Sequence, residues 1–185
     1  SRCASRSRPA PPPTSSSPCR APPCSLGGRL PDTLVVPVGN GTLLLGAALA
    51  TAELHALGLI ADRPRLVAVQ AEAVSPLAEA FRAGAEDLLP AGSGAPAPTL
   101  AEGIAIPRPP RARQILAAVR GSGGTFLTVS EDEIRDAQRD LAARGFYVET
   151  TGVACWAAVR DGAARGPGSV VVPLCGAGVK TGMAG

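Results

Sequence analysis

Short apolar runs alternate with longer alanine- and leucine-rich segments along most of this chain. Four runs are rich in β-branched residues: 33–38 (TLVVPV), 66–70 (LVAVQ), 124–129 (GTFLTV) and 169–174 (SVVVPL). Continuous apolar runs of this length are typical of strands that are buried on both faces, as in parallel sheets. The first run leads into Gly-Asn-Gly, and the last leads into Cys-Gly-Ala-Gly.

The segments between these runs are predicted to be helical. We expect helices over 42–57, 75–84, from 99, over 111–120 and 130–145, and from 150. Thr99 with Glu102 and Ser130 with Glu133 have the spacing of capping boxes. The alternation predicts an α/β fold with three layers, α/β/α, around a mostly parallel sheet.

Residues 1–29 differ in composition from the rest of the chain. They are rich in Ser, Pro and Arg, and seven of the 19 prolines lie in residues 1–23. Such a segment cannot bury enough apolar area to offset its ordering entropy, so we expect a disordered tail, or the product of a shifted reading frame. We therefore expect one folded domain over 30–185. A zinc site at Cys3, Cys19 and Cys24 is not favoured, because no His is near and no C-x2-C pair occurs.

The positive charge of the chain is confined to its first residues. The net charge is +3, but residues 1–30 hold five Arg and no acid, so residues 31–185 hold 13 basic and 15 acidic residues. This balance does not predict nucleic-acid binding, although binding through the basic tail stays an alternative. No run approaches the ~20 apolar residues of a membrane span. Two distant cysteines in the body, Cys155 and Cys175, fit a reduced, cytoplasmic protein.

The turn after the first apolar run is a candidate anion site. It comprises Val38, Gly39, Asn40, Gly41 and Thr42 and leads directly into a predicted helix. Glycines let the backbone approach a ligand, and the helix N-terminus and the Thr hydroxyl favour an anion such as phosphate. The turn is neither a Walker loop nor a GxGxxG fingerprint, and a tight strand–helix connection is the alternative.

Three other residues are candidates for chemistry. Cys175 follows the last strand and could be a packing residue, a hydrogen-bond partner or a nucleophile. A nucleophile is disfavoured, because no general base lies nearby in the sequence. Glu149 precedes a predicted helix and is either a site residue or a surface acid. His55, the one histidine, lies within a predicted helix, where a surface or partly buried position is expected.

Six segments together resemble the threonine synthase family, within the fold-type-II pyridoxal-phosphate enzymes. They are LPDTLVVPVGNGTLLLG (30–46), GLIADRPRLVAVQAEAVSPL (58–77), TLAEGIAI (99–106), GSGGTFLTVSEDEI (121–134), LAARGFYVETTGVACWAA (141–158) and VVVPLCGAGVK (170–180). Their order and spacing carry the resemblance more than any one motif does.

The resemblance implies the large-domain part of such an enzyme, with pyridoxal 5'-phosphate as cofactor. It implies that residues 38–42 bind the cofactor phosphate and that Cys175 contacts the pyridine nitrogen. The family usually has Ser or Thr at the position of Cys175. Glu149 would lie near the ring, although Thr150 replaces the proline of the family's Glu-Pro-Thr/Ser-Gly. The implied enzyme is a lyase that acts on a small amino-acid substrate. Its reaction converts O-phospho-L-homoserine and water into L-threonine and phosphate. The full-length family would form a homodimer.

The lysine content qualifies this expectation. The only lysine is Lys180, which matches the family's C-terminal Gly-x-Lys and not its Schiff-base motif. We therefore expect a C-terminal portion without a catalytic lysine, inactive alone and marginally stable because one face of the sheet lacks its cover. The alternatives are a threonine/serine dehydratase-like lyase and a non-catalytic cofactor-binding fragment.

Overall fold

The computed structural model describes residues 29–90, 97–160, 162 and 168–179. The expectations for residues 1–28, with their three cysteines, and for Lys180 lie outside these ranges. None of the described helices is long and apolar enough to span a bilayer.

Strands and helices follow one another nearly in the predicted order. The elements are β1 (Thr33–Pro37), α1 (Thr42–Ala56), β2 (Arg65–Ala71), the 3-10 turn η1 (Glu72–Val74), α2 (Pro76–Arg82), the 3-10 turn η2 (Glu102–Ile104), α3 (Ala112–Gly121), β3 (Thr125–Val129), α4 (Glu131–Ala143), α5 (Thr150–Arg160) and β4 (Val170–Val171).

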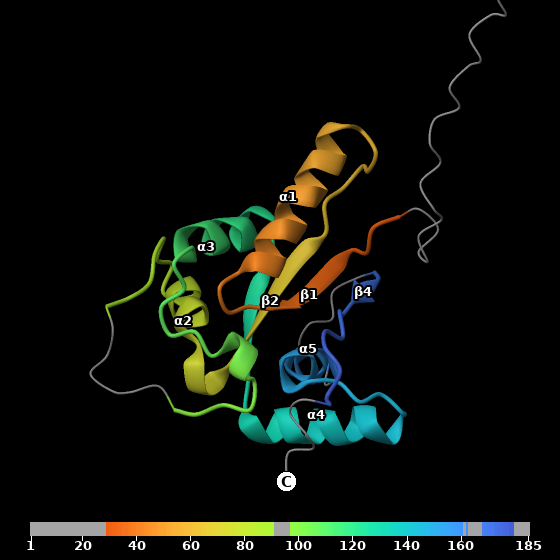
Figure 1. The fold of residues 1–185 in the computed structure, drawn as a ribbon. Helices are drawn as coiled ribbons and strands as arrows, with labels where there is room; N and C mark the ends of the chain where they lie inside the picture. The colour runs from red at the N-terminus through yellow and green to blue at the C-terminus, as the bar shows by residue number, and fades with distance from the viewer. Residues whose placement is uncertain (1–28, 91–96, 161, 163–167, 180–185) are drawn as a thin grey trace, which may run out of the picture.

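The four strands form one parallel sheet in the order β3-β2-β1-β4. Helices α1, α2 and α3 cover one face of this sheet, and α4 and α5 cover the other (Figure 1). The predicted three-layer α/β/α fold with a parallel sheet is therefore confirmed. The expectation that one face of the sheet lacks its cover is wrong, because helices pack on both faces. Strand β1 lies between β2 and β4, in the interior of the sheet.

Burial on both faces explains the continuous apolar runs. Along β2, Leu66 and Ala68 pack in the core beneath α1–α3, whereas Val67 and Val69 pack in the core beneath α4 and α5. All four side chains are at most 2% exposed. Because successive strand residues point to opposite faces, each run has to be apolar at every position.

The prediction of a helix from residue 99 is wrong, because only the short 3-10 turn η2 forms there. The Thr99 hydroxyl accepts from the Ala101 N–H at 3.2 Å, and Ala101 precedes the short turn η2, so Thr99 and Glu102 form no capping box. Pro107 lies a few residues later and disfavours a longer helix through this segment. The last strand is also shorter than the predicted 169–174, since pairing ends at Val171.

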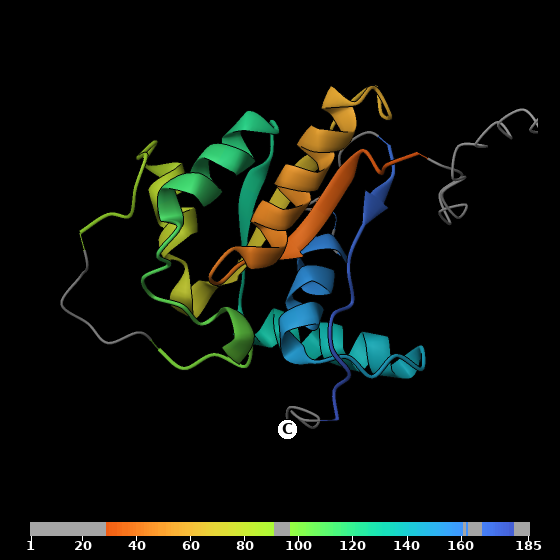
Figure 2. The same cartoon turned by 45° about the horizontal axis from the view of Figure 1, so that its top comes forward.

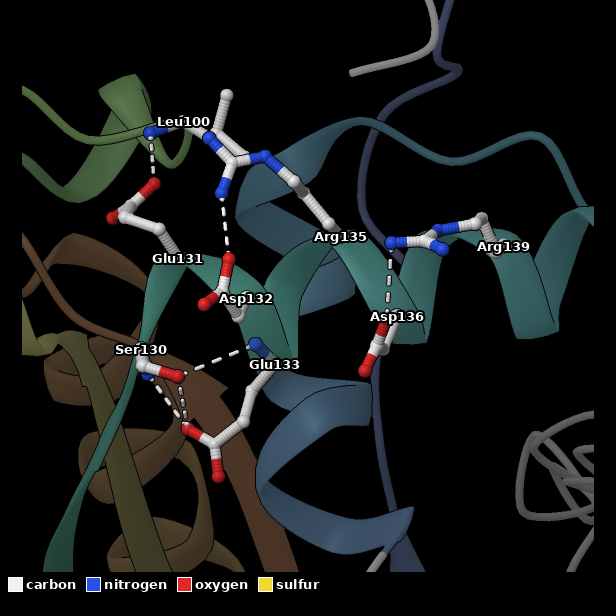
Figure 3. Close-up of polar contacts among 8 residues, drawn as sticks. All are labelled: Leu100, Ser130, Glu131, Asp132, Glu133, Arg135, Asp136 and Arg139. Atoms are coloured by element: carbon white, nitrogen blue, oxygen red, sulfur yellow. Dashed lines mark hydrogen bonds and ion pairs between the residues drawn. The ribbon is translucent and has the colours of Figure 1, made fainter. Parts of the chain in front are cut away.

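The second capping box is confirmed at the start of α4. The Glu133 N–H donates to the Ser130 hydroxyl at 3.3 Å, and the Glu133 carboxylate accepts from the Ser130 N–H at 2.7 Å (Figure 3). In the same first turn, Glu131 accepts from the Leu100 N–H at 2.8 Å. The start of α4 thereby holds the segment that leads into η2.

Candidate active site

The strand order reverses at β1, where a ligand crevice is expected. From β1 the chain passes to β2 and β3 on one side of the sheet, and it returns through α4 and α5 to β4 on the other side (Figure 2). Ligands of open parallel sheets bind beyond the carboxyl ends of the strands at such a point. Gly39–Thr42 follow β1 and Cys175 follows β4, so both predicted segments lie at this edge.

The strand register gives the same placement. Thr33 of β1 pairs with Val170 of β4, and the residues five positions further along each segment are Val38 and Cys175. The glycine turn and the Cys175 turn therefore both follow the carboxyl ends of adjacent parallel strands.

The glycine turn leaves the first amides of α1 without a hydrogen-bond partner in the helix. Gly41 adopts the left-handed conformation (φ 78°, ψ 10°) and is the N-cap residue, without a side-chain hydrogen bond. Its carbonyl accepts from the Leu45 N–H at 2.9 Å. The N–H groups of Thr42, Leu43 and Leu44 precede this first intrahelical bond and have no partner within the helix.

The glycine turn is closely packed on both sides. A Cβ on Gly41 would collide with the Ile115 side chain of α3. A Cβ on Gly39 would lie 2.9 Å from Cγ1 of Ile106 and 3.1 Å from the Gly103 carbonyl oxygen. The turn therefore packs between the N-terminal part of α3 and the η2 segment, with room only for glycine at both positions.

The η2 segment is itself held by hydrogen bonds through Leu100. Its N–H donates to Glu131, and its carbonyl accepts from the buried Thr150 hydroxyl at the start of α5. A Cβ on Gly103 would lie 2.6 Å from Oγ1 of Thr151, so η2 also contacts α5 directly. These contacts connect the glycine turn to the N-terminus of α5.

Glu149 and Cys175 meet on the other side of α5. Val148 and Ala177 form an antiparallel bridge, and the Glu149 N–H donates to the Gly176 carbonyl at 3.1 Å. The Glu149 carboxyl covers Gly176 so closely that a Cβ there would overlap it. Burial, followed by the negative charge of Glu149, raises the pKa of the Cys175 thiol. The thiol is therefore neutral at pH 7, which argues against a nucleophilic thiolate.

Gln70 positions the glycine turn, and sequence reasoning did not identify it. It is fully buried on β2, where its Oε1 accepts from the N–H groups of Leu77 and Ala78 at 3.1 and 3.0 Å. Its Nε2 donates to the Val38 carbonyl at 3.4 Å. An amide side chain within an otherwise apolar run was the feature that could have identified it.

Other predicted residues lie apart from this edge. His55 is exposed in the last turn of α1, at the opposite end of that helix from Gly41. A surface hollow lined by Asp32, Ile60 and Arg63 lies beside the amino ends of β1 and β2. Neither contributes to the crevice.

Fold and site together define a class of protein: a parallel three-layer α/β domain with a candidate ligand site where the strand order reverses. A family model described as pyridoxal-phosphate dependent enzyme matches residues 25–176. The chain therefore belongs to this family, whose members depend on pyridoxal phosphate.

This chain matches only part of the length of its curated relatives. A threonine synthase of Methanosarcina acetivorans is 35% identical over 71% of this chain and 32% of its own. A threonine synthase of Methanocaldococcus jannaschii is 34% identical over 67% of this chain and 30% of its own. The chain thus spans about a third of the length of these relatives.

Solved structures show the same fold. A threonine deaminase of T.th. has a TM-score of 0.63 and 31% identity, over 80% of this chain and 50% of that one. The threonine synthase of Escherichia coli has a TM-score of 0.61 at 18% identity, over 81% of this chain and 33% of that one, and supports the fold alone.

The residues present fit the phosphate end of the family's cofactor. The glycine turn is a cradle that a Cβ at Gly39 or Gly41 would disrupt. It presents amide donors at a helix N-terminus, together with the exposed hydroxyl-bearing residue Thr42, and both favour a phosphate.

The substitution Gly41→Ala is expected to weaken binding of pyridoxal phosphate. An alanine in the left-handed region costs about 1–2 kcal/mol, and here its Cβ also collides with Ile115. Gly58→Ala is the matched control, because Gly58 has a φ of 68° and nothing within 4 Å of an added Cβ. Equilibrium dialysis should give weaker affinity for the first variant only. Equal affinities would contradict this role of the turn.

Alkylation of Cys175 is expected to require a higher pH than alkylation of a free thiol. A raised pKa leaves less reactive thiolate at any given pH, and Glu149→Gln should partly reverse the shift by removing a negative charge. Peptide mapping after iodoacetamide treatment across pH 7–10 measures this, with the urea-unfolded chain as reference and buried Cys155 as the protected control. The same pH profile for Cys175 in folded and unfolded chains would contradict the prediction.

Proposed function

We propose that this chain supplies the phosphate-binding and ring-binding residues of a pyridoxal-phosphate-dependent lyase of the threonine synthase type. The observation that carries the proposal is the convergence of the glycine turn after β1 and the Cys175 turn after β4 at the strand-order reversal. The two archaeal relatives named threonine synthase support the reaction class. The substrate is then O-phospho-L-homoserine, and the products are L-threonine and phosphate.

Each residue of the proposed site has a separate role. The amides of residues 39–42 and the Thr42 hydroxyl bind the cofactor phosphate, and the Val38 carbonyl fixes the start of the turn through Gln70. Cys175, whose thiol donates to the Pro173 carbonyl at 3.5 Å, would contact the pyridine ring, and Glu149 orders the Cys175–Gly176 turn beside it. When bound, the cofactor supplies the electron sink for carbanion chemistry on the amino-acid substrate.

A threonine or serine dehydratase is the second candidate. The T.th. threonine deaminase is similar at 31% identity, close to the values for the two archaeal threonine synthases. The shared fold does not separate these reactions, because one fold can host different reactions.

We further propose that the 185 residues alone bind the cofactor without a covalent bond. Lys180 is the only lysine, and the resemblance places it outside the Schiff-base motif. After borohydride reduction of the chain with pyridoxal phosphate, mass spectra should therefore show Lys180 unmodified. The variant Lys180→Arg, which has no lysine, is the control and should give the same result. A pyridoxyl adduct on Lys180 that is absent from the variant would contradict this.

A segment exchange tests the substrate class. Residues 30–180 replace the matching segment of the Methanosarcina acetivorans threonine synthase, and phosphate release from O-phosphohomoserine is compared with 2-oxobutanoate formation from threonine. We expect phosphate release, and loss of most of it when the exchanged segment carries Gly41→Ala.

The other outcomes of this exchange are also informative. Formation of 2-oxobutanoate without phosphate release would favour the dehydratase. Cofactor absorbance without turnover of either substrate would favour a non-catalytic binding module.

A further inference from the structure

Arg111 joins the N-termini of two helices at the glycine turn. It is the N-cap residue of α3, and its Nη2 donates to Oγ1 of Thr42, the first residue of α1, at 2.8 Å. Both residues are exposed, and both lie at helix N-termini beside the glycine turn. Sixty-nine residues separate them in the sequence, and sequence analysis treated Arg111 only as a helix start.

The hydrogen bond sets the direction of the Thr42 hydroxyl. A threonine hydroxyl has one proton to donate, whereas a guanidinium donates only. Because Arg111 donates to Oγ1, the Thr42 proton is left for an acceptor elsewhere. The arrangement thus makes Thr42 a donor beside the open amides of α1, where an anion is favoured.

The charge of Arg111 is available to a ligand. Within the described residues it takes part in no salt bridge, whereas Arg113, two positions later, pairs with Asp87 at 2.7 Å. A guanidinium remains charged at every physiological pH, so one positive charge stays beside the turn. Two exposed arginines at the start of α3 therefore differ in whether a carboxylate already neutralises them.

We propose that Arg111 is a positioning residue for the phosphate of the cofactor, acting through Thr42. It fixes the Thr42 hydroxyl as a donor and adds a positive charge at the phosphate end of the crevice. The inference rests on the proposed cofactor site, and it adds to it a side chain that lies outside the glycine turn.

Binding of pyridoxal phosphate and of phosphate-free pyridoxal by the 185-residue chain tests the proposal. In equilibrium dialysis, Arg111→Met should weaken pyridoxal-phosphate binding about tenfold, the scale of one hydrogen bond from a charged group. Affinity for pyridoxal should stay within about twofold of wild type, since the lost interaction concerns only the phosphate. Arg113→Met, which removes the same charge from the same helix, should leave both affinities unchanged.

Two further variants separate positioning from folding. Arg111→Lys should recover part of the affinity, because it restores the charge but not the planar donor. Thr42→Val should weaken binding in the wild-type chain but add little in Arg111→Met, since the two residues act as one unit. A thermal melt of each variant verifies that it is folded.

Several outcomes would overturn the inference. Equal losses for pyridoxal phosphate and pyridoxal would make Arg111 a structural residue, and equal losses in the Arg111 and Arg113 variants would indicate general electrostatics. Unchanged binding by Arg111→Met would reject Arg111 while leaving the cofactor site standing. If wild-type chain bound no pyridoxal phosphate, the proposed function and the inference would both fail.

Discussion

The parallel pairing of β1 with β2 on one side and β4 on the other is the constraint on which the structure depends. Parallel neighbours need crossover connections, and here the crossovers run over opposite faces of the sheet. That division creates two cores, and it leaves the carboxyl ends of β1 and β4 without a crossover covering the crevice between them. The candidate site is thus a consequence of strand order before any side chain is considered.

Irregular segments next to the sheet are held by a few buried polar groups. Gln70 satisfies two amides at the start of α2 and the Val38 carbonyl, and Thr150 satisfies the carbonyl of Leu100. Leaving such a buried group unpaired costs about 1–3 kcal/mol, more than a typical hydrogen bond contributes. The resemblance implies a proline at position 150, and a proline could not make this hydrogen bond because it has no hydroxyl.

Sequence patterns predicted what depends on local chemistry. The apolar runs indicated strands buried on both faces, and Ser130 with Glu133 indicated the start of α4. The same capping-box spacing failed at Thr99 and Glu102, because tertiary hydrogen bonds at Leu100 determine that segment. Position 175 and the glycine turn could be placed at one edge of the sheet from the resemblance. The Gln70 and Arg111 contacts could not, because their partners at Val38 and Thr42 are 32 and 69 residues away.

The two ends of the proposed cofactor site differ in how far they depend on side chains. Backbone amides supply most of the donors at the proposed phosphate end and depend on the glycines at 39 and 41, with the Thr42 and Arg111 side chains beside them. A single side chain, Cys175, forms the proposed contact with the ring nitrogen, and exchanging it changes the electronic environment without disturbing the fold. The solved structures of a T.th. threonine deaminase and a maize serine racemase share this fold, the racemase at only 22% identity. The fold alone therefore does not determine the reaction, which has to depend on the side chains of the site.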